Sequence, residues 1–417
     1  MIQTNVILVI GYNNTRINDV KKIQKRALES LNAQTVLCKK SPTEEDRNAV
    51  DHVIDVDLSA TAENVRHVIE ECTRLDFKII AILPFSDPGT QLGAALADAL
   101  RLPGHDKNKI LAAFDKSHFR KQESETQNAP ENYLKVGSQR IHSYDELAAL
   151  FHKNKKVFLK PACEGNSRGC IAIHNENDLK TAWPQLEKYL SAGVVAEQLI
   201  TNAEEYSWDH INGHSWITEK ETTQNSYRAE IQQIVPAFLT EEKAKMLNEA
   251  GHFMAELCGH HNAACHNEIF FLKESNQVAA VEPNLRPAGM RIWDLAALAF
   301  QNFNPWEEWL KWATHQKSEI TQLTREYYSG IRMIGAKQDG VLKHLPEPQA
   351  YPPLSSETSI IEIVWTKKVN DRVSATQKDN ADFIGYVIAR SKDYAALKRD
   401  LKELTVQLAD QVEIIKA

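Results

Sequence analysis

The sequence has no excess of positive charge and no long apolar run. Its 417 residues include 49 basic and 56 acidic side chains, and the net charge of −7 gives no electrostatic basis for binding nucleic acid or acidic membranes. The first apolar run, from Val6 to Ile10, is far too short for a signal-peptide core or a membrane-spanning helix. We therefore expect a cytoplasmic protein with neither a nucleic-acid partner nor a membrane partner.

Cysteine is also scarce. Six cysteines spread over the chain are too dilute for a disulfide framework, which fits a reducing compartment. The one cluster that looks like a metal site is "CGHHNAACHNE", residues 258–268, and its spacing matches no C-x2-C zinc pattern. Because it lies where an amphipathic helix ends and a strand begins, buried helix-end cysteines are the alternative to a structural zinc.

Two common glycine-rich nucleotide signatures are missing. Only Gly11 follows the first apolar strand, so the dinucleotide fingerprint of three spaced glycines is absent and an NAD-binding fold is disfavoured. The stretch "KPACEGNSRGC", residues 160–170, is not a P-loop either. It does join two short strand-like segments, so its function has to be judged from its surroundings.

The chain is long enough for two or more domains. Residues 6–84 alternate strands with amphipathic helices over 18–32 and 62–75, which predicts an open parallel α/β sheet. Further helices are expected over 87–104 and 108–122. Between 155 and 283 the pattern is of paired strands, with turns at 212–213 and 274–277, so the middle of the chain should be antiparallel. Beyond 314 we expect more strands and a final helix over 392–412.

The loop of residues 162–169 could bind phosphate. Glycines allow its backbone amides to turn inward and hydrogen-bond phosphate oxygens, and Lys160 at the end of the preceding strand would add a positive charge. A plain polar hairpin is the alternative. Lys116, on the expected helix over 108–122, taken alone could be a surface lysine. Glu197 and Glu205 could accept ribose hydroxyls, although exposed loop acids are common.

The stretch "VEPNLRPAG", residues 281–289, carries Glu282, Asn284 and Arg286 at alternate positions, so a continuing strand would put all three on one face. In the partner strand Glu268 shares a face with His266. Two carboxylates and an amide oxygen are ligands that Mg²⁺ prefers. Arg286 would then stabilise charge on a transferred phosphoryl group. The alternatives are a solvated sheet face and an ordinary salt bridge of Arg286 to one of the two acids.

The segments follow one another in the order "DKSHFR", "VFLKP", "ACEGNSRG", "VVAEQLI", "EEYSWDHINGH" and "HNEIFFLKESNQVAAVEPNLRPAGMR". This order resembles that of the ATP-grasp superfamily. Within it the chain looks most like L-amino acid ligases, the carboxylate–amine ligases that join amino acids. The resemblance implies a mixed α/β and α+β fold in four parts. These are an N-terminal open parallel α/β domain (1–106), a subdomain with the phosphate loop (107–195), a subdomain with the metal and catalytic residues (196–314), and a C-terminal β-rich lid (315–417).

The resemblance also implies roles for individual residues. Lys116 and Lys160 resemble the lysines that hold ATP phosphates, and Glu205 resembles the ribose ligand. The remaining implied nucleotide contacts are the phosphate-loop residues Ser167, Arg168 and Gly169, the hinge residues Glu197, Gln198 and Leu199, and His266. The implied metal ligands are Glu268, Glu282 and Asn284. The implied catalytic residues are Lys160, Arg286 and Arg291, and Gly289 with Arg291 would hold a substrate carboxylate.

The reaction implied by the resemblance uses ATP and Mg²⁺, with Mn²⁺ as a substitute. A carboxylate attacks the γ-phosphorus, an acyl phosphate and ADP form, and an amine then displaces phosphate to give an amide. The expected partners are small molecules, an amino acid or another carboxylate plus an amine, and a homodimer is open. The alternatives are a bicarbonate-activating carboxylase or purine-pathway ligase of the same superfamily, and a non-catalytic ATP-binding regulatory protein.

Overall fold

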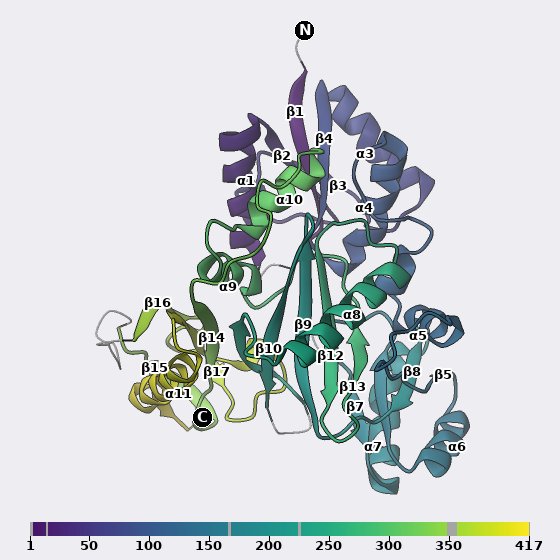
Figure 1. Ribbon diagram of the computed structural model, residues 1–417, viewed down its shortest axis with the longest axis vertical. Coiled ribbons are helices and arrows are strands. Elements are labelled where there is room, and N and C mark those ends of the chain that lie inside the picture. The colour runs from purple at the N-terminus through teal and green to yellow at the C-terminus, as the bar shows by residue number, and fades with distance from the viewer. Residues whose placement is uncertain (1–2, 14–15, 166–167, 224–226, 348–356, 417) are drawn as a thin grey trace.

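The computed structural model describes residues 3–13, 16–165, 168–223, 227–347 and 357–416. Figure 1 shows the N-terminal sheet at the top, a small sheet at the lower right, and a long central sheet that continues into the C-terminal strands at the lower left. No helix within these ranges combines the length and the apolar character that crossing a membrane requires.

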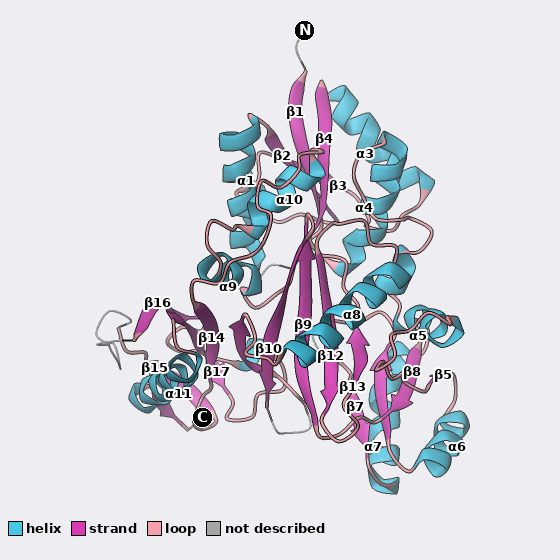
Figure 2. Cartoon of the chain, in the orientation of Figure 1, coloured by secondary structure: helices cyan, strands magenta, loops and turns pink. Residues whose placement is uncertain are grey.

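The N-terminal sheet is open and parallel, as predicted. Its strands stand in the order β3-β2-β1-β4, which are His52–Asp55, Gln34–Lys39, Thr4–Ile10 and Phe77–Pro84. The helices between and after them are α1 (Ile17–Leu31), α2 (Glu44–Arg47), α3 (Ala62–Arg74) and α4 (Asp87–Leu100). Figure 2 shows α1 on one side of this sheet and α3 and α4 on the other. Ile7 and Val9 pack in one core with α1, whereas Val6 and Leu8 pack in another with α3 and α4. Both faces of β1 are therefore covered, which explains its unbroken apolar run.

The carboxyl ends of β1 and β4 form a switch point, because α1 and α4 leave these neighbouring strands toward opposite faces. Open α/β sheets bind ligands beside such strand ends. In the first turn of α4, Gly89 lies so close to β1 that a Cβ would be 2.3 Å from the Ile10 carbonyl oxygen. This contact fixes the start of α4, and with it Asp87, at the strand ends.

The single helix predicted over 108–122 is wrong. The chain forms a short 3-10 helix, η2 (Ile110–Ala113), and then α5 (Lys116–Glu125). Asp115 between them is extended, and its side chain accepts hydrogen bonds from the amides of Ser117 and His118. An aspartate that caps a helix in this way starts a new helix rather than continuing the previous one. Lys116 is therefore the first residue of α5.

The small sheet is antiparallel and has the order β5-β8-β6-β7. Its strands are Ser138–Ile141, Val194–Gln198, Val157–Pro161 and Ile171–Ile173, and the helices α6 (Tyr144–Asn154) and α7 (Glu176–Leu186) belong to the same region. The loop between β6 and β7 contains the stretch singled out as a candidate phosphate loop. The short 3-10 helix η3 (Glu187–Tyr189) follows α7.

The central sheet has eight antiparallel strands. In spatial order they are β13 (Gln277–Glu282), β12 (Cys265–Leu272), β9 (Ala203–Ile211), β10 (His214–Thr222), β11 (Glu230–Val235), β14 (Tyr328–Ile334), β18 (Gly385–Ser391) and β16 (Thr358–Trp365). Asn212 and Gly213, both with positive φ, turn β9 into β10 as predicted. Helices α8 (Glu241–Leu257) and α11 (Tyr394–Gln411) cover one face, and α9 (Ile292–Ala299) packs on the other.

The C-terminal region is rich in β-strands and contains the predicted last helix as α11. Its strands β14, β18 and β16 extend the central sheet beyond β11. A separate three-stranded sheet contains β17 (Arg372–Val373), β15 (Gly340–His344) and β19 (Glu413–Ile415), and the remaining helices are α10 (Pro305–Ala313) and η5 (Asn380–Asp382). The four domain boundaries stay predictions.

Candidate active site

Lys160 reaches from the small sheet to the hairpin of β12 and β13. Its Nζ donates a hydrogen bond to the Val281 carbonyl oxygen at 3.0 Å and lies 2.9 Å from Glu197 Oε2. Glu197 also accepts a hydrogen bond from Arg120 Nε at 2.6 Å, and all three charged side chains are buried. Burial alone would raise the pKa of Glu197, but Arg120 and Lys160 lower it to about 2. Glu197 is thus an ionised partner for Lys160.

Lys116 reaches the same hairpin from α5. Its Nζ lies 3.1 Å from Glu282 Oε2 and donates to the Glu164 carbonyl oxygen at 2.6 Å. The amide of Lys116 donates to the Ala162 carbonyl oxygen, which ties the start of α5 to the beginning of the candidate phosphate loop. Burial disfavours the charged ammonium, yet Glu282 outweighs it and the pKa of Lys116 is raised. Both predicted phosphate lysines therefore meet at the end of β13.

Glu268 and Glu282 are direct cross-strand partners in the β12–β13 ladder. The strand ends at Glu282, because Pro283 has no amide hydrogen to donate. The expected face persists beyond it: His266 donates its amide to the Asn284 carbonyl oxygen at 2.7 Å, and Asn284 Nδ2 lies 3.5 Å from Glu282 Oε1. Two facing carboxylates and a buried amide oxygen make an all-oxygen donor set that fits Mg²⁺.

A small cavity, open to solvent, lies between the N-terminal sheet, α5 and this hairpin. Its polar lining comes from Asp87, Lys116, Glu164, Glu282 and Asn284, and the other lining residues are Ala112, Ala113, Phe114, Cys163, Gly165 and Pro283. Predicted phosphate-binding and metal-binding residues therefore face one space.

Arg286 is held at this site by two neighbours. Its guanidinium donates from Nε and Nη2 to the two carboxylate oxygens of Asp87, at 3.0 and 3.2 Å, and from Nη2 to Asn284 Oδ1 at 3.2 Å. Burial lowers the pKa of Arg286, but Asp87 outweighs it, and the net change is upward. Asp87 was missed from sequence. Its position just after an apolar strand, at the start of a helix, was the available signal.

A second cluster lies deeper on the same face of the central sheet. Lys220 of β10 places its Nζ 3.0 Å from Glu205 Oε1 and 2.7 Å from Glu230 Oε1, and it also forms an ion pair with Glu268. Burial raises the pKa of Glu205, and the two other acids add to the increase. Burial also acts to raise the pKa of Glu268, but Lys220 and His266 lower it. Lys220 and Glu230 were both missed from sequence.

His266 connects this cluster to a buried aspartate. Its Nδ1 lies 2.9 Å from Asp209 Oδ1 and its Nε2 lies 3.5 Å from Glu268 Oε1. Ser207 and Thr218 donate hydroxyl hydrogen bonds to Asp209. Burial alone would lower the pKa of His266, but the two carboxylates raise it to about 9, so the imidazole is protonated at neutral pH.

No protein-family model matches the sequence. No curated protein matches it either. Solved structures match over nearly the whole chain: an L-amino acid ligase from Bacillus licheniformis, 16% identical, covers 100% of both chains with a TM-score of 0.76. A phosphoribosylglycinamide synthetase from Anaerococcus prevotii is 15% identical over 99% of this chain and 100% of its own, with a TM-score of 0.68. The biotin carboxylase domain of a Hydrogenobacter thermophilus 2-oxoglutarate carboxylase is 14% identical, covering 99% and 91%, with a TM-score of 0.67.

The chain has the ATP-grasp fold. The predicted phosphate loop is described only in part, since Ser167 lies outside the described residues. Arg168 is exposed and its Nη2 lies 3.0 Å from Glu164 Oε2. Gly169 has φ +72°, and a Cβ there would lie 2.7 Å from the Tyr189 ring, so the position requires glycine. The roles of the loop residues in ATP binding stay predictions.

The predicted ATP-grasp hinge residues follow β8. Gln198 is the exposed last residue of that strand and donates its amide to the Gly137 carbonyl oxygen at 2.8 Å, and Leu199 beside it is half-buried. Their part in adenine recognition stays a prediction.

Gly289 and Arg291, predicted to hold a substrate carboxylate, lie on the segment that enters α9. A Cβ at Gly289 would meet nothing within 4 Å. Arg291 has φ +60°, forms an ion pair with Asp294, and places Nη1 2.9 Å from the Tyr386 hydroxyl and 3.1 Å from Glu362 Oε2. Its guanidinium is thus directed toward the C-terminal strands and already faces two acids, so binding a substrate carboxylate requires Arg291 to share or exchange these partners.

Gln233 of β11 is a further polar residue that sequence reasoning missed. It is fully buried, pairs across the ladder with Lys220, and neither its amide nitrogen nor its amide oxygen has a hydrogen-bond partner among the described residues. Buried amides without partners are costly, which makes Gln233 a candidate substrate contact.

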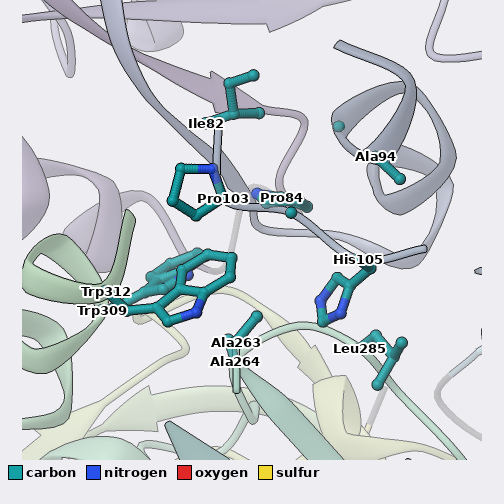
Figure 3. A pocket seen from close by; sticks show the side chains of 12 residues that line it. Ile82, Pro84, Ala94, Pro103, His105, Ala263, Ala264, Leu285, Trp309 and Trp312 are labelled. Carbon is teal, nitrogen blue, oxygen red and sulfur yellow. The ribbon is translucent and has the colours of Figure 1, made fainter. Parts of the chain in front are cut away.

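A separate small cavity has a mostly apolar lining. Figure 3 shows His105 and Leu285 on one side of it and Trp309 and Trp312 on the other. Burial lowers the pKa of His105 well below its usual value, so the ring is neutral. Because Leu285 separates Asn284 from Arg286, packing around this cavity anchors the backbone between two polar residues of the site.

Proposed function

We propose that this protein is an ATP-dependent ligase that joins a carboxylate to an amine, with amino acids as substrates, and releases ADP and phosphate. The observation that carries the proposal is the convergence of Lys116, Glu282 and Asn284 on one cavity, with Arg286 hydrogen-bonded to Asn284 beside it. Phosphoryl transfer needs these residue types, because cations neutralise phosphate oxygens and carboxylates hold a divalent metal.

The choice of amino acids is supported by the likeness to an L-amino acid ligase over the full length of both chains. A biotin carboxylase domain solved with MgADP and bicarbonate also shares the fold. A bicarbonate-activating carboxylase is therefore the second candidate, since one fold supports several activities.

In the proposed reaction a carboxylate oxygen of the first substrate attacks the γ-phosphorus of ATP, and the bond from that phosphorus to the bridging oxygen breaks as ADP leaves. Lys116 and Lys160 bind phosphate oxygens, and Arg286 stabilises the charge on the transferred group. Mg²⁺, or Mn²⁺ in its place, would be held by Glu268, Glu282 and Asn284 and would neutralise and orient phosphate oxygens.

The amine of the second substrate then attacks the acyl carbon. The bond from that carbon to the phosphate oxygen breaks, phosphate leaves with the bonding electron pair, and the nitrogen releases a proton to solvent as the amide forms. No covalent bond to the enzyme is needed, so no serine or cysteine nucleophile is assigned. The hinge residues, Glu205 and the phosphate loop would contact the nucleotide, and a homodimer stays a prediction.

The charge pairs observed around the site suit this chemistry. Lys116 lies beside Glu282 and Lys220 beside Glu268, so each predicted metal carboxylate has a lysine as an ion-pair partner. Arrival of a negatively charged nucleotide together with a divalent cation would exchange the partners of the Lys116–Glu282 pair, the lysine for phosphate and the carboxylate for metal. The exchange leaves few unpaired charges in a largely buried site, which keeps its free-energy cost low.

The test is a screen for ATP-dependent release of ADP and phosphate with Mg²⁺ and pairs of amino acids, followed by identification of the amide product. Product from bicarbonate and an amine, but from no pair of amino acids, would make the carboxylase the better assignment. Nucleotide binding without turnover on any substrate set would favour a non-catalytic regulatory protein.

Replacement of a predicted metal ligand gives a sharper test. Glu282→Gln removes one carboxylate charge and should lower turnover by at least about a hundredfold, because charge stabilisation at such sites is worth several kcal/mol. Circular dichroism should show an unchanged fold. The matched control is Glu274→Gln, in the exposed turn of the same hairpin, which should keep wild-type turnover. Equal activity of both variants would refute the metal assignment.

A further inference from the structure

The lysine at the centre of the second cluster is more deeply buried than the acids around it. The side chain of Lys220 is 1% exposed, whereas those of Glu205, Glu230 and Glu268 are 18%, 20% and 17% exposed. The ammonium therefore lies beneath three carboxylates that reach the surface of the site. Each acid offers an oxygen within 4.8 Å of the others, a spacing that could also suit a metal ion.

The charge balance of this group is unusual. Three carboxylates and one ammonium leave two negative charges, which is the charge that one divalent cation would neutralise; the positive charge of His266 beside Glu268 is balanced by Asp209 on its other side. The members come from four different strands, β9, β10, β11 and β12, so the arrangement depends on the folded sheet. Glu230 is fixed further by Asn380, whose Nδ2 donates to Glu230 Oε2 at 2.8 Å.

Without Lys220 the three acids would form an all-protein cage for a divalent ion. Mg²⁺ sites that act on nucleotides normally use one or two carboxylates and complete their coordination with substrate phosphates. An additional strong cage would take metal in the absence of nucleotide and would compete for Glu268. The Lys220 ammonium prevents metal binding in the absence of nucleotide, because it repels a divalent cation and forms ion pairs with the carboxylate oxygens that the metal would need.

We propose that Lys220 is a positioning residue that acts as a resident counter-ion, holding Glu268 in place and keeping metal affinity low until the nucleotide brings its own phosphate ligands. The inference rests on the proposed ATP and metal site. It goes beyond that proposal by assigning Lys220 and Glu230, neither of which needs to contact substrate, to the control of metal binding.

The test measures binding of Mn²⁺ alone to the full-length, nucleotide-free protein by electron paramagnetic resonance. Lys220→Met should bind Mn²⁺ on the order of tenfold to a hundredfold more tightly than wild type, because a positive charge a few ångströms from the ion is removed. Lys220→Arg retains the charge and should restore weak binding. The matched control is Lys243→Met, which removes another lysine from an ion pair, with Glu204 beside Glu205, but leaves the cluster intact.

Loss of Lys220 could prevent folding, so a double variant accompanies it. Lys220→Met with Glu230→Gln removes one charge of each sign and keeps the net charge of the group, and it should bind Mn²⁺ more tightly than wild type and less tightly than the single variant. Binding no tighter than that of the Lys243→Met control, in whichever of the two variants folds, would overturn the proposal.

Separate measurements distinguish this inference from the proposed function. If wild type binds Mg-ADP and forms an amide while the Lys220 variants show no gain in Mn²⁺ affinity, the counter-ion role alone fails. If wild type neither binds Mg-ADP nor turns over, the proposed function fails, and the Mn²⁺ measurements then decide only whether the cluster controls metal binding.

Discussion

Replacement of Asp87 by asparagine should slow the proposed reaction without unfolding the protein. Asp87 belongs to the N-terminal sheet region, yet both of its carboxylate oxygens accept hydrogen bonds from Arg286, at 3.0 and 3.2 Å. An asparagine at this position would retain the shape and one acceptor oxygen but lose the charge and one of the two bonds. The guanidinium of Arg286 would then lose its fixed orientation beside Asn284.

The size of the effect follows from the exposure of the pair. Hydrogen bonds between charged groups contribute about 1.5–3 kcal/mol. The side chains are 15% exposed for Arg286 and 25% for Asp87, so solvent screening reduces the loss to about 1–2 kcal/mol. If Arg286 stabilises the transition state and has to keep this position to do so, the same free energy appears in the barrier, and kcat falls by about fivefold to thirtyfold.

The assay is steady-state ADP release, with urea unfolding of the same variants as the stability measurement. The matched control is Asp98→Asn in the same helix, where an exposed carboxylate lies 2.6 Å from Lys107 Nζ and does not line the cavity. Asp98→Asn should leave kcat unchanged. If Asp87→Asn also leaves kcat unchanged, Arg286 does not depend on Asp87 and the reasoning is refuted.

Two further predictions concern stability. Burial lowers the pKa of His210 to about 3 and that of His260 to about 4, so both stay neutral in the folded state while the unfolded residues titrate near 6.5. The contribution of these two histidines to the free energy of unfolding is complete above pH 6.5 and is lost below it, by about 4 kcal/mol in total between pH 7 and pH 5. Urea unfolding measures the stability at both pH values, and equal stabilities would contradict the prediction. Gly169→Ala should destabilise the folded protein by about 2–4 kcal/mol, because Gly169 has a positive φ and a Cβ there would contact Tyr189. The control Gly213→Ala has a positive φ but open space around it, and it should lose only about 1 kcal/mol. Thermal unfolding of both variants measures the difference.

Local sequence patterns predicted several of the residues that the structure brings together at the site. Alternation placed Glu282, Asn284 and Arg286 on one face, and they do converge even though the strand stops at Glu282. What preserves the alternation is the hydrogen bond from the His266 amide to the Asn284 carbonyl oxygen, which continues the strand-like path beyond Pro283. A period-two pattern therefore predicted the correct grouping although its assumption of a continuing strand failed.

Contacts between segments that are distant in the chain could not be predicted from the sequence. Asp87 and Arg286 are separated by 199 positions, and the sequence around each of them does not indicate that the two residues are in contact. Lys220 looked like any polar strand residue, because its three acidic partners lie on other strands whose order is fixed by tertiary packing. The break at Asp115 is different in kind, since a helix-capping aspartate was visible in the sequence and outweighed the helical pattern around it.

The junction of β11 with β14 has a consequence for how the chain can be divided. Gln232 to Val235 form a ladder with Ser329 to Arg332, so the strands of the predicted lid supply the neighbour that β11 needs. A chain cut after residue 314 would leave a bare sheet edge across the middle of the molecule, with unpaired amides and carbonyls next to apolar side chains such as Ile234. Such edges recruit other strands, and the shortened protein would be expected to self-associate rather than persist as a soluble catalytic core. The C-terminal quarter of the chain therefore completes the central sheet.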